Sequence, residues 1–271
     1  MTNYKRQIYD LPIGVFDSGM GGLTVLRQLK LQLPNESFLY LGDTARLPYG
    51  TKSQDTVIAY AKQMAQSLVD KGIKLLVIAC NTATTAALPV LQQLLPQLPI
   101  IGVIEPGAKA ASQASKNERV LVLATETTVL SGVYNKAILA NAPAFEVKEQ
   151  ACGLFVALAE EGCVDDAVCQ AVIEKYIPRR LEQDCILLGC THFPVFKATI
   201  QAHVGQHVAI VDSAVETTKA VKQVLDNQKL HRLAVDKPTI TYLVTDLPER
   251  FMRIAPTFLG EGISESQVEV I

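Results

Sequence analysis

Short apolar runs alternate along the chain with longer segments in which apolar residues recur at helical spacing. The runs that we predict as strands are Ile13–Phe16, Ser37–Gly42, Leu75–Ala79, Ile100–Ile104, Val120–Ala124, Phe145–Glu149, Ile186–Gly189, Val208–Val211, Ile240–Val244 and Val268–Ile271. A continuous apolar run is typical of a strand that is buried on both faces. Such strands, when helices separate them, predict an α/β fold of mostly parallel sheets flanked by helices.

The clearest helical segment is Ser53–Lys71, which is followed by Gly72. Its apolar residues at helical spacing are Val57, Ala61, Met64 and Leu68. One apolar face of this kind predicts a helix that packs on a sheet, and glycine is a common residue just after a helix end.

The chain is expected to form two lobes. Its 271 residues fit about two domains, and the pattern weakens at Leu95–Pro99 and near Asp212. We therefore expect a discontinuous arrangement, in which residues 1–98 and 213–271 form the first lobe and residues 99–212 form the second.

Two segments of the sequence resemble each other. Leu75–Thr82 and Cys185–His192 each contain an apolar strand, a small residue, a cysteine and then hydrogen-bonding side chains. The similarity favours two pseudo-symmetric lobes with an active site in the cleft between them. Cys80 would belong to the first lobe and Cys190 to the second.

Composition and charge exclude several classes of protein. Hydrophobic residues make up 49% of the chain and charged residues 19%, which is enough for a packed core. The net charge of −2 gives no electrostatic footprint for nucleic acid or an anionic membrane surface. No apolar run reaches the roughly 18 residues of a spanning helix, and the N-terminus lacks the apolar core of a secretory signal. With six cysteines in a chain of this length, we expect reduced thiols and a cytoplasmic protein.

The residues that follow the predicted strands carry the candidate chemistry, because open parallel sheets bind ligands at the carboxyl ends of their strands. These residues are Asp17-Ser18, Asp43-Thr44, Cys80-Asn81-Thr82, Glu105, Thr125, Cys190-Thr191-His192 and Asp212. Aspartate, serine and threonine at such positions often cap the next helix. For Glu105, Thr125 and Asp212 we expect a capping or turn role.

Cysteine is a poor cap, so Cys80 and Cys190 need another explanation. Both follow a strand and are expected to precede a helix, whose N-terminus lowers the pKa of a thiol from about 8.5. The remaining cysteines are expected to be small buried hydrophobic residues; they are Cys152, Cys163, Cys169 and Cys185.

Other cysteine chemistries fit less well. No pair has the C-x-x-C spacing of a structural zinc site, so no metal site is predicted. A hydrolase that pairs Cys190 with His192 is an alternative, but residues two apart do not face each other on a helix. Such a hydrolase would also leave Cys80 unused.

The segment Asp17–Thr24, with its run of glycines, follows the first strand and leads into a helix. Glycines allow close approach of a ligand to the backbone, and a helix N-terminus favours an anion. The spacing is not that of a dinucleotide or Walker loop. A second loop, Asp43–Gly50, contains Pro48 and is expected to form a turn.

Together these motifs resemble the glutamate racemases of the cofactor-independent aspartate/glutamate racemase superfamily. The matching stretches are IGVFDSGMGGLTVL (13–26), LGDTARLPYG (41–50), VIACNTATTAAL (77–88), VIEPGAKAA (103–111), ATETTV (124–129) and LLGCTHFPVF (187–196). They cover the chain from its first strand to about residue 212. The sequence departs from the family at Cys152-Gly153, at Ala157–Glu160 and at Phe193, where the family usually has Cys-Pro, Pro-Leu-Val-Glu and tyrosine.

The resemblance implies a racemase with two catalytic bases, one on each face of the substrate Cα. It implies that Cys80 acts on D-glutamate and Cys190 on L-glutamate, and that Asp17 and His192 assist proton transfer or hold the ammonium group. It also implies a substrate site lined by Asp17, Ser18, Tyr49, Gly50, Asn81, Thr82, Thr191 and His192. Because no arginine cluster accompanies the motifs, neutral side-chain donors and backbone N–H groups are expected to hold the carboxylates.

The family further implies that neither a cofactor nor a metal is needed and that D-glutamate is made for peptidoglycan. Glutamate is then the partner, and a homodimer is possible. His203, His207 and His231 are expected to be solvent-facing or packing residues. Two alternatives stay open: a related racemase that acts on aspartate, and a two-lobed binding protein without catalysis. The second has no need of both strand-end cysteines.

Overall fold

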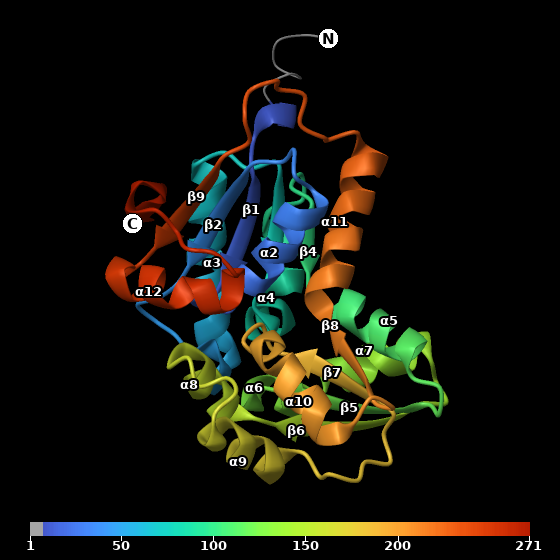
Figure 1. The fold of residues 1–271 in the computed structure, drawn as a ribbon. Helices are drawn as coiled ribbons and strands as arrows, with labels where there is room; N and C mark the ends of the chain where they lie inside the picture. Colours follow the sequence, from blue (N-terminus) through green and yellow to red (C-terminus); the bar gives the residue numbers. More distant parts are fainter. Residues whose placement is uncertain (1–7) are drawn as a thin grey trace.

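The computed structural model describes residues 8–271 and contains two parallel sheets (Figure 1). In the first sheet the strand order is β10-β9-β2-β1-β3-β4, and in the second it is β6-β5-β7-β8. The first sheet comprises β1 (Ile13–Asp17), β2 (Phe38–Gly42), β3 (Leu75–Ile78), β4 (Ile100–Gly102), β9 (Ile240–Val244) and β10 (Val268–Val270). The second comprises β5 (Arg119–Ala124), β6 (Glu146–Ala151), β7 (Cys185–Gly189) and β8 (Ala209–Asp212).

Helices connect the strands and cover the sheets. The α-helices are α2 (Leu23–Gln32), α3 (Gln54–Asp70), α4 (Asn81–Leu94), α5 (Ile104–Ala114), α6 (Glu126–Ser131), α7 (Val133–Asn141), α8 (Gly153–Glu160), α9 (Ala167–Tyr176), α10 (Lys197–Val204), α11 (Ser213–Gln228) and α12 (Pro248–Leu259). Short 3₁₀ helices are η1 (Tyr49–Thr51), η2 (Phe193–Phe196) and η3 (Glu265–Gln267). The predicted α/β class with two helix-flanked parallel sheets is confirmed.

Successive strand residues point to opposite faces of each sheet, and both faces are apolar. In β1, Val15 packs with residues of α2 and α12, whereas Phe16 packs with α3 and α4. In β5, Leu121 joins α8, α9 and α10, whereas Val122 joins α5 and α7. The edge strand β6 differs from the prediction of a run buried on both faces, because its residues are exposed or half-buried.

Helix α3 forms where the periodicity predicts it. The Ser53 hydroxyl accepts a hydrogen bond from the Thr56 N–H, and the predicted apolar face is buried. Gly72 follows the helix with a φ of +80°, a backbone conformation that costs glycine little.

The chain leaves the first sheet after Gly102, later than the predicted boundary at residue 98. Ile100 pairs with Leu76 and Gly102 with Ile78, so β4 is an edge strand of the first sheet. The Leu95–Pro99 segment that indicated a break is a short turn between α4 and β4, in which the Leu98 N–H donates to the Leu95 carbonyl. After β8, helix α11 packs against both α2 and α5.

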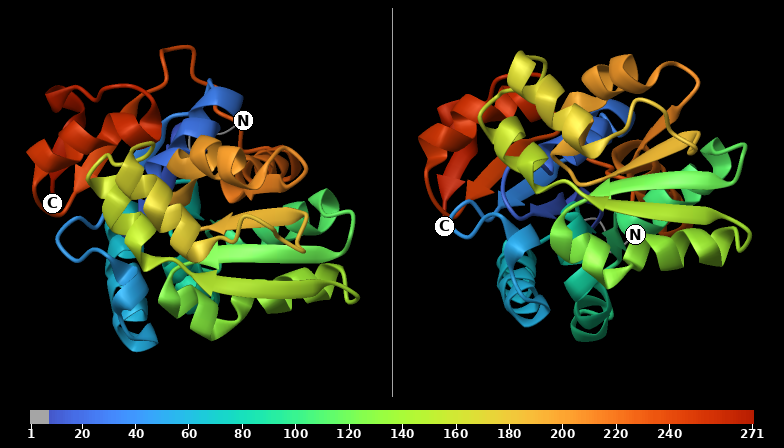
Figure 2. Two further views of the ribbon diagram at one scale, coloured as in Figure 1. Left: turned by 60° about the horizontal axis from the view of Figure 1, so that its bottom comes forward. Right: turned by 90° about the horizontal axis from the view of Figure 1, so that it is seen from below.

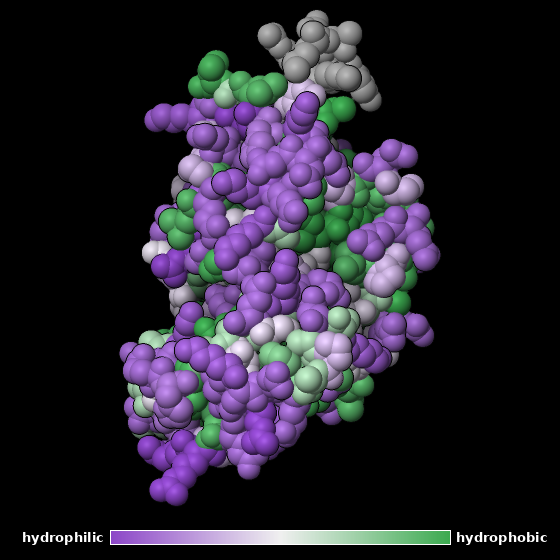
Figure 3. All heavy atoms as spheres, turned by 90° about the vertical axis from the view of Figure 1, so that its right-hand side faces the viewer, coloured by the Kyte–Doolittle hydropathy of each residue, from purple (hydrophilic) through white to green (hydrophobic). Residues whose placement is uncertain are grey.

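In Figure 1 the second sheet lies below the first, and Figure 2 shows its strands side by side from below. Hydrophilic residues cover most of the face shown in Figure 3. Within residues 8–271, no helix is long and apolar enough to cross a membrane. Residues 1–7, on which the expectation of no secretory signal partly rests, lie outside the described part of the chain.

Candidate active site

Cys80 lies at the boundary between β3 and α4. It is the N-cap of α4, and its sulfur accepts a hydrogen bond from the Ala83 N–H at 3.4 Å. Only 5% of the residue is exposed. The prediction that this cysteine follows a strand and begins a helix is therefore confirmed.

The expected lowering of the Cys80 pKa is wrong for the protein without substrate. Burial, together with the charge of Asp17, raises the pKa of this thiol to about 12. Hydrogen bonds with Ser18 and the Ala83 N–H act in the opposite direction but are outweighed. The desolvation of the thiolate thus exceeds the stabilisation that the helix N-terminus provides.

Cys190 follows β7 as predicted and lies in a turn before the short 3₁₀ helix η2, so it does not cap an α-helix as Cys80 does. Its sulfur is 3.8 Å from Nδ1 of His192. The expectation that these two side chains would not face each other is wrong, because it assumed helical geometry. Residues 190–192 instead turn back on themselves, and the Phe193 N–H donates to the Cys190 carbonyl.

His192 forms the centre of a buried chain of polar groups. Its Nε2 is 3.2 Å from Oε1 of Glu160, whose Oε2 accepts a hydrogen bond of 3.4 Å from Arg250. Burial by itself lowers the pKa of His192, but hydrogen bonds with Cys190 and Glu160 and the charges of Cys190 and Asp17 raise it to about 10. His192 therefore lies between the sulfur of Cys190 and the carboxylate of Glu160.

Asp17 joins the first sheet to the Cys190 segment. It is fully buried at the end of β1, and its carboxylate accepts hydrogen bonds from the Gly19 N–H at 3.0 Å and from the Thr191 hydroxyl at 3.4 Å. Burial raises the pKa of Asp17, whereas the positive charge of His192 lowers it. A carboxylate therefore lies within electrostatic reach of Cys80 and His192 at once.

The glycine run after β1 permits this approach. A Cβ atom on Gly21 would lie 2.5 Å from Nδ1 of His192 and 2.6 Å from the Thr191 hydroxyl oxygen. One on Gly22 would lie 2.5 Å from the Asp17 Cβ. The structure shows close approach of protein side chains at these glycines, and the approach of a ligand there stays a prediction.

The loop after β2, which contains Gly50, contacts the residues at the start of α6. The Thr127 hydroxyl donates to the Gly50 carbonyl at 2.8 Å, and a Cβ on Gly50 would lie 2.7 Å from the Cβ of Thr125. Tyr49 is buried beside it and donates a hydrogen bond of 2.5 Å to Asp43.

Asn81 and Thr82, at the start of α4, also form hydrogen bonds with residues that follow β5 of the second sheet. The Thr82 and Thr125 hydroxyl oxygens are 3.1 Å apart, and Oδ1 of Asn81 accepts a hydrogen bond of 2.5 Å from the Tyr134 hydroxyl. The side chain of Thr125 does not cap α6 as predicted, because it bonds instead to Thr82 and Thr128.

The other two predicted strand-end caps differ from each other. Asp212 does cap α11, since its carboxylate accepts a hydrogen bond from the Ala214 N–H at 2.8 Å. Glu105 lies in the first turn of α5 and is not the residue that caps it, because Val103 holds that position.

A model of the Asp/Glu/Hydantoin racemase family matches residues 13–221. A glutamate racemase of Geobacter metallireducens is 46% identical over 255 residues, which cover 93% of this chain and 94% of the relative. The structure of glutamate racemase from Francisella tularensis in complex with D-glutamate matches with a TM-score of 0.90 at 35% identity, over 97% of this chain and 98% of that one. A glutamate racemase from Thermus thermophilus in complex with β-chloro-D-alanine matches with a TM-score of 0.85 at 40% identity, over 97% of each chain. The chain belongs to the Asp/Glu/hydantoin racemase family.

In this family member the residues that we predicted as site residues lie close to the junction of the two sheets. Contacts within this region join Asp17 to Thr191, Cys190 to His192 and Ser18 to Cys80. Three further residues were not predicted as site residues: Glu160, Arg250 and Tyr134. Glu160 lies in a stretch that departs from the family pattern, and nothing in the sequence pattern pairs Arg250 or Tyr134 with the cysteine motifs.

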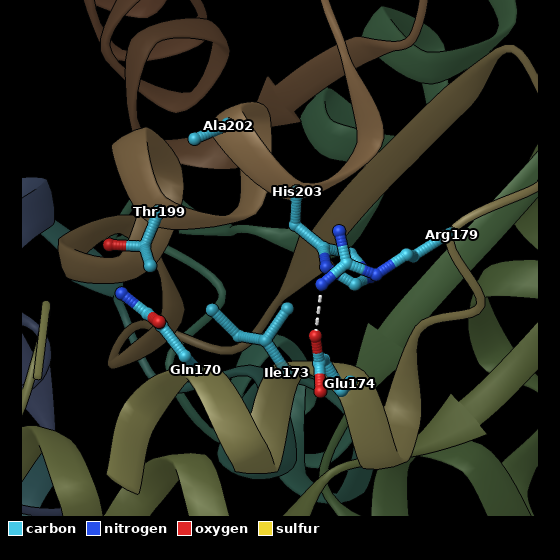
Figure 4. Close-up of a pocket in the computed structure, with 7 residues that line it drawn as sticks. All are labelled: Gln170, Ile173, Glu174, Arg179, Thr199, Ala202 and His203. Atoms are coloured by element: carbon cyan, nitrogen blue, oxygen red, sulfur yellow. Dashed lines mark hydrogen bonds and ion pairs between the residues drawn. The ribbon is translucent and has the colours of Figure 1, made fainter. Parts of the chain in front are cut away.

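The remaining cysteines and histidines of this family member lie outside the site. Cys152, Cys169 and Cys185 are buried as predicted, whereas Cys163 is half-buried. His203 lines a hollow of about 190 Å³ between α9 and α10, beside the ion pair of Glu174 and Arg179 (Figure 4). In the described part of the chain, no group of three or more His, Cys, Asp or Glu residues could hold a metal ion.

Proposed function

We propose that the protein interconverts L- and D-glutamate and that Cys80 and Cys190 carry the two protons. The observation that carries the proposal is the pair of buried cysteines, each following a strand of a different sheet, in a region where Asp17 of the first sheet bonds to Thr191 beside Cys190. Two acid/base groups on opposite faces of one carbon can invert it without turning the substrate over.

The reaction on L-glutamate begins with Cys190 as a thiolate and Cys80 as a thiol. Cys190 takes the proton from Cα, and Cys80 delivers its proton to the opposite face, which gives D-glutamate. Cys80 is then the thiolate and Cys190 the thiol, which is the state required for D-glutamate. The proton count is unchanged, and the two thiols titrate as one unit.

The two cysteines have different neighbours. The pKa of Cys80, raised to about 12, keeps this group a thiol at neutral pH. Nδ1 of His192 lies 3.8 Å from the sulfur of Cys190, where it can assist proton transfer at that thiol. His192 therefore assists proton transfer at Cys190, and Asp17 assists it at Cys80.

Neutral groups hold the substrate. The hydroxyls of Ser18, Thr82 and Thr191 and the amide of Asn81 supply hydrogen bonds to the two carboxylates, and Asp17 holds the ammonium group. Two nearby arginines are already paired: Arg46 with Asp43 at 2.8 Å, and Arg250 with Glu160 at 3.4 Å. A preorganised set of neutral donors stabilises the carbanionic transition state.

Glutamate is chosen over aspartate because relatives of similar length, at 38–46% identity over most of the chain, carry the glutamate racemase name. The role we infer is to supply D-glutamate for peptidoglycan without a cofactor. A cytoplasmic location and a homodimer stay predictions from the sequence.

Incubation with L-glutamate in D₂O tests this function. We expect loss of optical rotation together with deuterium at Cα, and much slower exchange of L-aspartate in a parallel sample. Faster exchange of aspartate would contradict the choice of substrate. Binding of glutamate with no exchange at Cα would show a binding protein and refute catalysis.

A further inference from the structure

Tyr134 lies in a helix that packs on the second sheet, and its side chain contacts a residue of the candidate site. It lies in α7, is fully buried, and its hydroxyl is 2.5 Å from Oδ1 of Asn81 at the start of α4. Asn81 directly follows Cys80 in the chain. The hydrogen bond therefore connects the helix whose N-cap is one cysteine with the lobe that carries the other.

The other end of the Asn81 side chain has no partner. Its Nδ2 is one of two buried side-chain nitrogen or oxygen atoms in residues 8–271 that lack a hydrogen bond. Asn81 is only 2% exposed. A buried amide that uses its oxygen and leaves its NH₂ group unpaired is costly in the free protein, and a ligand that accepts a hydrogen bond removes this cost.

The direction of the hydrogen bond follows from the groups around Tyr134. Burial raises the pKa of this phenol well above its usual range, so the hydroxyl keeps its proton. The Tyr134 hydroxyl is accordingly the donor in the hydrogen bond with Oδ1 of Asn81. Because the amide oxygen accepts this proton, the NH₂ group of Asn81 points away from Tyr134 and stays without a partner.

Two glycines leave the space in which the Tyr134 ring packs closely. A Cβ on Gly189, next to Cys190, would lie 2.8 Å from Cε2 of Tyr134, and one on Gly107 would lie 3.4 Å from its hydroxyl. The ring thus fits closely against the strand that leads to the second cysteine. Its hydroxyl has little freedom to turn away from Asn81.

We propose that Tyr134 is a positioning residue, which fixes the Asn81 amide so that its NH₂ group donates to a substrate carboxylate. The inference deepens the proposed function and rests on it, because the carboxylate is taken to be that of glutamate. Tyr134 itself does not touch the substrate.

Tyr134→Phe removes the hydroxyl and keeps the ring. We expect kcat/KM for glutamate to fall about tenfold to a hundredfold, the range for a lost hydrogen bond to a charged group, with most of the change in KM. Tyr242→Phe is the matched control, since Tyr242 is a buried tyrosine in β9, and its kcat/KM should equal that of the unaltered protein.

A double-mutant cycle with Asn81→Ala separates positioning from a general structural effect. If Tyr134 acts through Asn81, adding Tyr134→Phe to Asn81→Ala lowers kcat/KM by less than twofold more. Unchanged kinetics in Tyr134→Phe would overturn the inference. So would a loss that is equally large in the Asn81→Ala background.

The side-chain amide resonances of Asn81 test the same inference without activity. They are assigned by their loss in Asn81→Ala, and Tyr134→Phe should shift them in the free protein, whereas Tyr242→Phe should not. Resonances unmoved by Tyr134→Phe contradict the inference. If the unaltered protein failed to racemise glutamate, the proposed function would fail, and the resonances would still decide whether Tyr134 orients Asn81.

Discussion

At the scale of the residue, surroundings give two cysteines different properties. Burial raises the pKa of Cys80, while a histidine of raised pKa lies beside Cys190. The sequence motifs predicted both cysteines as site residues. They did not predict this difference, because the degree of burial and the contact with His192 depend on side chains that are distant in the chain.

Glu160, the carboxylate that bonds to His192, gives a prediction for the pH dependence of activity. The folded-state pKa of about 10 lies above the ordinary 6.5, so protonation of His192 stabilises the folded protein fully below pH 6.5, and this contribution is lost as the pH rises through 10. Glu160→Gln removes one cause of the raised pKa. The alkaline fall in kcat/KM should therefore begin at lower pH in this variant.

A pH–rate profile for L-glutamate between pH 6 and 11 measures the effect. Glu174→Gln is the control, because Glu174 of α9 is a carboxylate in an exposed ion pair with Arg179. An alkaline limb at the same pH in Glu160→Gln and the unaltered protein would show that Glu160 does not set the charge of His192.

At the scale of the element, the strands were predictable because their apolar runs report burial directly. The ends of the elements and the tertiary contacts between them were less predictable from the sequence. The turn that brings Cys190 to His192 was expected to be the start of a helix, and the residues of β4, which pair with β3, were not expected in the first sheet. Glu160 reaches His192 because Phe155 in α8 packs against Phe193 and Phe196 in η2, with ring centroids 5.3 and 5.0 Å apart. No local pattern encodes that contact.

The loop between β1 and α2 gives a prediction at this scale. In Gly21→Ala the new Cβ would clash with His192 and Thr191, so the loop and the Cys190 segment must move apart. We expect kcat/KM to fall by about 10²-fold, as for a misplacement of about 1 Å. Gly262→Ala, where a Cβ meets nothing within 4 Å, should keep the kinetics of the unaltered protein. Equal kinetics in the two variants would show that close approach at Gly21 is not needed.

At the scale of the whole molecule, neither sheet holds a complete site. The Thr24 hydroxyl donates to the Thr191 carbonyl at 3.0 Å, and Thr82 and Gly50 contact Thr125 and Thr127 at the start of α6, which follows β5 of the second sheet. These bonds set two strand ends against each other, with one cysteine on each. The internal similarity of the sequence predicted this symmetry, although the contacts that join the lobes became visible only in the structure.

The central claim is that each cysteine serves one face of the substrate, and Cα–H exchange in D₂O tests it most directly. Cys80→Ala and Cys190→Ala are each given L- and D-glutamate, and Cys163→Ala, a half-buried cysteine outside the site, is the control. Both site variants should lose racemisation. Cys80→Ala should exchange only L-glutamate, through Cys190, and Cys190→Ala only D-glutamate, through Cys80. Racemisation at the unaltered rate in either variant, or the same enantiomer preference in both, would contradict the claim.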